Sequence, residues 1–145
     1  LIVNETEAET IAGKKIDSIG REAIVDALLA LGANTVILTL GEKGCCLKNQ
    51  DLHISIPAFK VNVKDTTGAG DTFCGALAVG LAKGEDWIYI LEYATAASAI
   101  CVTRMGAQPS IPKENEVTSF MRKKLTSLNQ LTVSNGNGKT KPEYP

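Results

Sequence analysis

Short β-branched runs and longer helical stripes of apolar residues alternate along the chain. Leu1 to Val3 and Thr35 to Leu40 are too short for helices, and their apolar character predicts buried strands. Between these runs, the residues from Ser18 to Leu31 place apolar side chains at helical spacing and predict one amphipathic helix. Its stripe consists of Ile24, Leu28 and Leu31. Gly32 follows at the position of a C-terminal helix cap.

A short helix is predicted directly after the first strand. Asn4 is placed to cap it, because an asparagine side chain accepts hydrogen bonds from the free amides of a first helical turn. Acidic residues follow at Glu5, Glu7 and Glu9, where they favour the positive end of the helix dipole. We expect Gly13 to end this helix.

The middle of the chain predicts further strands. Cys45 to Leu47 and His53 to Ile56 flank the polar residues Lys48 to Asp51, a pattern that predicts a β-hairpin. Phe59 to Val63 alternates apolar and polar residues and predicts one more strand. Strands that alternate with helices are typical of α/β layered folds, so we expect a mainly parallel sheet.

The second half of the chain is predicted to be helical. A helix from Gly70 to Lys83 carries one apolar stripe, and a helix from about Trp87 to Thr103 is dense in alanine and expected to be buried. The stripe consists of Phe73, Leu77 and Leu81. After two prolines we expect a last helix near Lys113 to Lys124. The polar composition of residues 127–145 predicts a flexible tail after one domain of residues 1–126.

Composition and charge exclude several classes of function. Of the 145 residues, 44% are hydrophobic and 21% are charged, which suits a chain that buries one core. The formal net charge of -1 gives no global attraction for nucleic acid or for an anionic membrane. No apolar run approaches the roughly 20 residues that span a bilayer, and the first residues lack the features of a signal peptide. We therefore expect a cytoplasmic protein.

The cysteines and the single histidine form no metal-binding or redox motif. Cys45, Cys46, Cys74 and Cys101 contain no CxxC pair, and three of the four lie in apolar segments, so we expect buried free thiols. His53 lies on a predicted strand and is interpreted as a structural or surface residue. A histidine-based triad or a multi-histidine metal site is therefore not expected.

The segment from Val63 to Phe73 carries the candidate chemistry. A predicted strand runs into Gly68-Ala69-Gly70 and then directly into a helix. Glycines expose successive amides, and a helix N-terminus adds roughly half a positive charge, so this turn is a candidate anion hole. Asp71 stands at the same turn, where its carboxylate could take a proton from an attacking hydroxyl. The alternative is that Asp71 only caps its helix and the glycines only form a turn.

The wider sequence resembles the ribokinase or PfkB carbohydrate kinase family. DTTGAGDTFCGAL, from Asp65 to Leu77, is similar to the family's C-terminal signature. NETE at residues 4–7 resembles the family's N-x-x-E motif, and TLGEKG at residues 39–44 resembles its nucleotide-binding turn. VTRMGAQPS at residues 102–110 resembles a segment typical of ribose-specific members. The motifs follow in family order as far as residue 112. The resemblance implies a three-layer ribokinase-like fold whose N-terminal half and lid are missing here.

The resemblance also implies roles for individual residues. It makes Asp71 the catalytic base and gives the phosphate-cradling backbone to Gly68, Ala69 and Gly70. Glu7 would act near the phosphates through water bound to Mg²⁺. The implied nucleotide-binding residues are Asn4, Glu7, Thr39, Leu40, Gly41, Glu42, Lys43, Gly44, Gly70 and Thr95. Thr95 departs from relatives, which often carry Asn or His there, and a buried threonine bonded to its own helix is the alternative.

A monovalent cation, usually K⁺, lies beside the anion hole in the family. The implied positions here are Asp65, Thr67, Cys101, Arg104, Gly106 and Ser110. Most of them would contribute carbonyl oxygens, so the identity of their side chains carries little information.

The resemblance implies phosphorylation of D-ribose at its 5-hydroxyl by ATP, with this chain supplying the ATP site and the base. Two alternatives stay open: a kinase of another sugar or nucleoside, and a non-catalytic module that binds nucleotides. The sugar-binding residues would belong to the missing half, and a full-length protein could form a homodimer. A sheet without that half is expected to expose an edge or an apolar patch.

Overall fold

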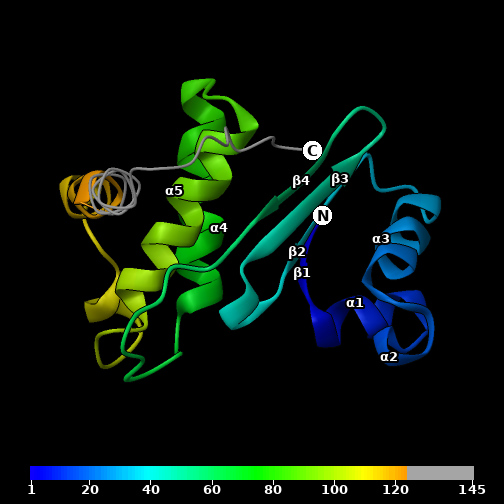
Figure 1. The fold of residues 1–145 in the computed structure, drawn as a ribbon, viewed down its shortest axis with the longest axis horizontal. Helices are drawn as coiled ribbons and strands as arrows, with labels where there is room; N and C mark the ends of the chain where they lie inside the picture. Colours follow the sequence, from blue (N-terminus) through cyan, green and yellow to red (C-terminus); the bar gives the residue numbers. More distant parts are fainter. Residues whose placement is uncertain (124–145) are drawn as a thin grey trace, which may run out of the picture.

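The computed structural model describes residues 1–123, which form an α/β fold around one four-stranded sheet (Figure 1). The strands are β1 (Ile2–Asn4), β2 (Thr35–Thr39), β3 (Cys45–Asn49) and β4 (His53–Ile56), and they are hydrogen-bonded in the order β1-β2-β3-β4. Each of them overlaps a strand predicted from the sequence. The predicted hairpin is confirmed as β3 and β4.

The sheet is mixed, so the prediction of a mainly parallel sheet was wrong. β1 pairs parallel to β2, whereas β2–β3 and β3–β4 are antiparallel. The connection from β1 to β2 contains three helices and is long enough for a crossover. β2 and β3 are joined by residues 40–44 alone, and so short a connection reverses the chain direction.

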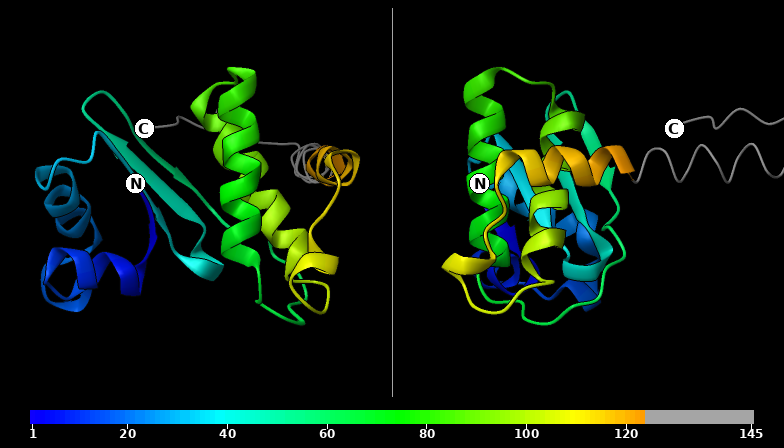
Figure 2. Two further views of the ribbon diagram at one scale, coloured as in Figure 1. Left: turned by 180° about the vertical axis from the view of Figure 1, so that it is seen from behind. Right: turned by 90° about the vertical axis from the view of Figure 1, so that its left-hand side faces the viewer.

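Helices cover both faces of the sheet and give three layers. α1 (Glu5–Ala12), α2 (Ile16–Ile19) and α3 (Arg21–Ala30) lie on one side, and α4 (Ala69–Lys83) and α5 (Trp87–Cys101) lie on the other (Figure 1). Residues 114–123 form a further helix, which lies against α5 on the side away from the sheet (Figure 2). This arrangement confirms the predicted layered architecture.

Alternation along β2 supplies both hydrophobic cores. Ile37 faces α4 and α5, where Phe73 and Leu77 are buried. Its neighbours Val36 and Leu38 face the other helices and pack in a separate cluster with residues of α1 and α3. Successive side chains of a strand point to opposite faces, so one apolar run is buried on both sides.

The start of α1 is confirmed as predicted. The Asn4 side chain accepts a hydrogen bond from the Glu7 amide, and the Glu7 carboxylate accepts one from the Asn4 amide, both at 2.9 Å. This reciprocal capping box satisfies two amides of the first turn. Gly13 ends the helix in the left-handed conformation, with φ 65°.

Some helical predictions require correction. The predicted helix from Ser18 to Leu31 is divided into α2 and α3 at Gly20, whose φ of 84° and ψ of 161° are incompatible with a continuous helix. Leu31 caps α3 and is 66% exposed, and Leu81 on α4 is 45% exposed, so neither completes its predicted buried stripe. Cys74 is also exposed, although all four cysteines are free as expected.

The segment from Phe59 to Val63 is not a strand. It follows Pro57 at the end of β4 and runs along α5 instead of pairing with the sheet (Figure 1). Phe59 packs edge to face on Phe120, with ring centroids 5.3 Å apart, which holds the segment against the helix of residues 114–123. Phe59 and Val61 are half-buried, whereas Val63 is 61% exposed, so the alternation expected of a strand does not continue along the segment.

The remaining predictions differ little from the structure. α5 ends at Cys101, two residues before the predicted end, and His53 is an exposed residue of β4. None of the helices within residues 1–123 is both long and apolar enough to cross a bilayer. The tail predicted for residues 127–145 lies outside the described residues.

Candidate nucleotide and phosphate site

The candidate site lies where β1 and β2 end. Asn4 and Thr39 are paired in the parallel ladder, so the segments that follow the two strands leave the same edge of the sheet. Ligands of open α/β folds bind at the carboxyl ends of such strands. The loop that carries the predicted nucleotide turn and the helix start that carries Glu7 therefore begin side by side.

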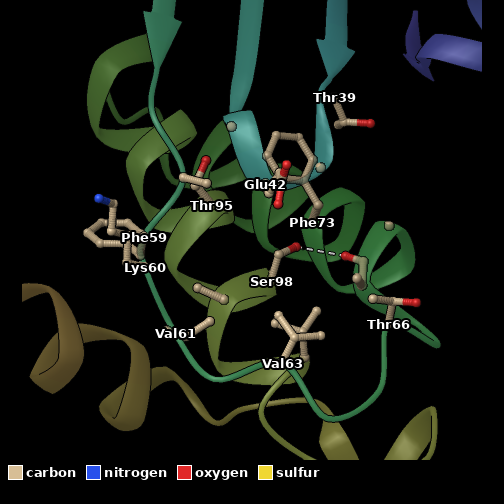
Figure 3. Close-up of a pocket in the computed structure, with 17 residues that line it drawn as sticks. Thr39, Glu42, Phe59, Lys60, Val61, Val63, Thr66, Phe73, Thr95 and Ser98 are labelled. Carbon is tan, nitrogen blue, oxygen red and sulfur yellow. Dashed lines mark hydrogen bonds between the residues drawn. The ribbon is translucent and has the colours of Figure 1, made fainter.

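A cavity of about 830 Å³ opens between this sheet edge, the segment after β4, and helices α4 and α5 (Figure 3). Seven of the predicted site residues line it: Thr39, Gly41, Glu42, Gly44, Ala69, Gly70 and Thr95. The structure thus brings the predicted nucleotide turn and part of the glycine turn, separated by some 25 positions in the sequence, to one cavity. Its volume is within the range of small-molecule sites.

Six of the residues predicted for nucleotide binding and catalysis do not line this cavity: Asn4, Glu7, Leu40, Lys43, Gly68 and Asp71. Asn4 and Glu7 hold each other in the capping box described above. Asp71 directly follows the cavity-lining residues Ala69 and Gly70 along α4 but is not itself part of the lining. The cavity is therefore adjacent in the chain to an exposed acidic residue.

The turn at the start of α4 has free backbone donors. Gly68 adopts φ 78° and ψ 3°, a left-handed conformation that favours glycine, and it precedes the first helical residue. Ala69 donates its amide hydrogen to the Thr66 carbonyl, and Thr72 donates to that of Gly68. Within residues 1–123, the amides of Gly70 and Asp71 donate to no other group. Unpaired amides at a helix N-terminus form a favourable site for phosphate oxygens.

Asp71 is exposed at the third position of α4. Gly68, the residue before α4, has no side chain that could cap the helix, and within residues 1–123 the Asp71 carboxylate makes no hydrogen bond to the first turn. Burial, and after it the carboxylates of Asp71 and Glu7, raise the pKa of the nearby Cys74 thiol.

The turn between β2 and β3 depends on close backbone approach. Gly41 to Lys43 form a single 3₁₀ turn, and Leu40 donates its amide hydrogen to the Gly44 carbonyl at 2.8 Å. A Cβ atom on Gly44 would lie 2.0 Å from the Ile56 carbonyl oxygen, and its φ of 99° also favours glycine. The last glycine of the TLGEKG turn is therefore required by the end of β4, which forms the neighbouring cavity wall.

Inside the cavity, two polar side chains are bonded to the protein. Ser98 donates its hydroxyl hydrogen to the Ala69 carbonyl at 2.7 Å, and the Thr95 hydroxyl lies 3.6 Å from the Cys45 sulfur. The Thr95 hydroxyl thus contacts β3, whereas the alternative interpretation had it bonded to its own helix. The other walls are largely apolar, so the cavity suits a flat aromatic ring bound by packing and by main-chain groups.

Several lining residues were not identified from the sequence. They are Ala58, Phe59, Lys60, Val61, Val63, Thr66, Phe73, Ser98, Ala99 and Val102. Four of them, Phe59, Lys60, Val61 and Val63, belong to the segment predicted as a strand, and Figure 3 shows this segment passing around the cavity as a loop. Ser98 and Ala99 are neighbours on α5, and Val102 follows about one turn later at the end of the helix. The only signal for them was the unusual density of small residues on α5, which also suits simple close packing.

The six residues predicted for a monovalent cation gather around the start of α4 and the loop after α5. The Asp65 carboxylate accepts hydrogen bonds from the amide and hydroxyl of Thr67 and from the Gly106 amide. These bonds, the one from the Thr67 hydroxyl first, hold the pKa of Asp65 below its ordinary value. Cys101 contacts the hydroxyl of the buried residue Ser110 at 3.0 Å. Ionised carboxylate and carbonyl oxygens are the donors that a hard cation prefers.

Comparison with known proteins places these features in a family. Residues 1–114 match the pfkB family of carbohydrate kinases. A ribokinase of Staphylococcus aureus is 41% identical over 123 residues, which cover 81% of this chain and 39% of that protein. Other relatives are a deoxyribokinase of Salmonella typhi and a fructokinase of Zea mays.

Solved structures resemble the same region. The Arabidopsis thaliana ribokinase complexed with ribose and ATP has 36% identity and a TM-score of 0.76, over 83% of this chain and 39% of that one. A putative ribokinase II of E. coli, in complex with ATP and Mg²⁺, has 26% identity and a TM-score of 0.77, over 84% and 38% of the two chains. The chain therefore spans about two fifths of the length of the relatives that it matches.

Proposed function

Because the chain belongs to the pfkB family of carbohydrate kinases, we propose that it forms the C-terminal, nucleotide-binding and catalytic part of an ATP-dependent sugar kinase. One observation carries the proposal: the cavity leads to a glycine turn with free helix-start amides, and an exposed carboxylate follows at the next residue. A largely apolar cavity for a base, donors for phosphates and a proton acceptor thus occur in the order that phosphoryl transfer requires.

The chemistry follows from this order. The base of ATP occupies the cavity, and its terminal phosphates extend to the amides of Gly68, Gly70 and Asp71. Asp71 accepts the proton of a sugar hydroxyl as that oxygen bonds to the γ-phosphorus, while the bond from phosphorus to the bridging oxygen breaks and ADP leaves. The amides stabilise the charge that spreads over the transferred phosphoryl oxygens. Base catalysis by a carboxylate is worth about 10²- to 10⁴-fold.

Glu7 and Asn4 are the residues proposed to act near Mg²⁺. One Glu7 oxygen and the Asn4 amide oxygen are used in the capping box, which leaves the second Glu7 oxygen for a metal-bound water. This fits Mg²⁺, which keeps several of its waters in nucleotide sites. When bound with ATP, the ion supplies charge neutralisation of the phosphates.

The loop around Asp65 is proposed to hold K⁺. The residues present offer the Asp65 carboxylate, and the other donors would be backbone carbonyl oxygens of the surrounding loop. The Arg104 guanidinium is bonded to Glu116, so its positive charge is neutralised there. These donors fit a hard monovalent cation, which would strengthen the positive field at the glycine turn.

D-ribose, phosphorylated at its 5-hydroxyl, is the acceptor that we propose. The VTRMGAQPS segment and the ribokinases among the relatives support it. Relatives that act as deoxyribokinases and fructokinases support another sugar as the second candidate.

Calorimetric titration with ATP, with and without Mg²⁺, tests the nucleotide site. We expect Gly68→Ala to weaken ATP binding by at least about 10-fold, because Gly68 is left-handed and its Cβ would lie 3.3 Å from the Ala107 backbone. Gly84→Ala is the matched control, since Gly84 is a left-handed glycine at the other end of α4 with open space around it. Equal affinities for both variants would contradict the site.

A second measurement separates the kinase from the non-catalytic module. Residues 1–123 replace the matching part of the Staphylococcus aureus ribokinase, and ADP release is followed with and without D-ribose. Ribose-dependent release supports the kinase. ATP binding without any sugar-dependent release supports the module.

A further inference from the structure

The helix of residues 114–123 is bonded to the loop beside the glycine turn. The Arg104 guanidinium donates a hydrogen bond to Glu116 and forms an ion pair with it. The helix itself is anchored on α5, because Val117 and Met121 pack against Ala96 and Ile100. Arg104 is therefore tied to a helix that is packed on the body of the protein.

Glu116 holds a defined position at the start of its helix. Its second carboxylate oxygen accepts a hydrogen bond of 2.8 Å from the Lys113 amide, as in a capping box. The Lys113 amide, and after it Arg104, lower the pKa of Glu116. Both partners of the ion pair are only about one third exposed, with side-chain accessibilities of 34% and 38%. The pair is more restrained than a fully solvated one.

The loop of residues 103–107, which contains Arg104, contacts the residues that precede α4. Gly106 donates its amide hydrogen to one Asp65 oxygen at 2.9 Å, and Thr67 donates to the other oxygen. Ala107 lies against Gly68: a Cβ atom added to Gly68 would be only 3.3 Å from the Ala107 Cα, which is closer than an ordinary van der Waals contact. The loop thus contacts the two residues that lead into α4.

We propose that Glu116 is a positioning residue for the glycine turn, acting through Arg104 and the loop of residues 103–107. Glu116 touches no proposed ligand itself. Its carboxylate holds Arg104, the loop then holds Asp65 and Gly68, and these set the direction of the free amides at the start of α4. The effect on ATP binding rests on the proposed function, whereas the effect on the turn is independent of it.

The same helix offers a matched control. Glu114 forms an ion pair with Lys83 at 2.6 Å, at the far end of α4 from the glycine turn. Glu114→Gln and Glu116→Gln remove the same charge from the same helix. Glutamine also keeps the hydrogen-bonding capacity that the Lys113 amide requires. Only the loss of the negative charge at Glu116 weakens the ion pair with Arg104 and thereby the contact to the loop of residues 103–107.

Hydrogen exchange of the chain without nucleotide, read by mass spectrometry, tests the proposal. We expect Glu116→Gln to speed exchange in peptides of residues 66–73 by about 2- to 5-fold, the range of a partly exposed ion pair. Peptides from β2 and α3 should be unchanged, and Glu114→Gln should leave residues 66–73 unchanged. Faster exchange throughout the chain, or no difference between the variants, would overturn the proposal.

Charge reversal provides a second test. Arg104→Glu and Glu116→Arg should each speed exchange at residues 66–73, and the double variant should restore it toward the wild-type rate. Failure of the double variant to restore the rate would overturn the proposal. If ATP binds, Glu116→Gln should also weaken it by about 2- to 5-fold. Absence of ATP binding to the wild-type chain would count against the nucleotide site, while the exchange result would still decide the role of Glu116.

Discussion

Ser98 on α5 donates its hydroxyl hydrogen to the carbonyl oxygen of Ala69, the first residue of α4, at 2.7 Å (Figure 3). The two residues are 29 positions apart in the sequence. Their bond joins the two cavity-lining helices directly below the glycine turn. It fixes where the free amides of that turn lie relative to the proposed base compartment.

Removal of this bond should destabilise the protein. Ser98→Ala is expected to lower the free energy of unfolding by about 1 kcal/mol, since one buried hydrogen bond is lost. Urea denaturation followed by circular dichroism measures the change. Ser119→Ala, at an exposed helical position, should have almost no effect. An equal decrease in the free energy of unfolding in both variants would show that the hydrogen bond from Ser98 to Ala69 does not stabilise the protein.

The two glycines of the TLGEKG turn should differ in their tolerance of a side chain. Gly44→Ala is expected to cost about 3 kcal/mol or more, because its Cβ would collide with the Ile56 carbonyl in addition to the strain of a positive φ. Gly41→Ala meets no atom within 4 Å and should cost about 1 kcal/mol from its positive φ alone. Thermal denaturation of the two variants provides the comparison. Equal losses would rule out the close approach to β4.

Asp71 should be required for turnover but not for ATP binding. In the chimera with the Staphylococcus aureus ribokinase, Asp71→Asn is expected to lower kcat by at least about 10²-fold and to leave the Kd for ATP almost unchanged, because only proton acceptance is removed. Asp51→Asn, in the exposed hairpin turn, serves as the control. Near-normal turnover of Asp71→Asn would contradict its role as the base.

Burial of Cys45 should make stability depend on alkaline pH. Burial raises the pKa of the Cys45 thiol to about 11, from an ordinary value of 9.0. Between these values the unfolded state loses the thiol proton while the folded state keeps it, so stability falls as pH rises. The difference in unfolding free energy between wild type and Cys45→Ala should be constant below pH 8 and decline by up to about 1.4 kcal/mol per pH unit above 9. A difference that is constant to pH 11 would refute this.

Local sequence patterns predicted most elements of the fold. The capping residue Asn4, the glycine-led start of α4 and the hairpin strands all depend on residues close together in the chain, and these predictions are confirmed. Prediction was wrong where a distant partner decided the outcome. The segment from Phe59 to Val63 has the alternating pattern of a strand. In the structure it pairs with no strand; Phe59 packs on Phe120, and other side chains of the segment line the cavity.

The candidate site shows the same division. Family motifs in the sequence indicated the two turns, and the structure brings Gly41, Gly44 and Gly70 to one cavity. The walls made by Val61, Ser98 and their neighbours carried no recognisable pattern, because an apolar or small residue has the same sequence signal in a core and in a binding cavity.

The sequence by itself determined the family, most of the strands and helices, and the position of Asp71 after a glycine turn, because these depend on local backbone preferences and on contiguous motifs. Only the tertiary structure decided that the sheet is mixed, which side chains enclose the cavity, and that Arg104 is held by Glu116. Those features depend on contacts between residues far apart in the chain, and such contacts form only when the layers pack together.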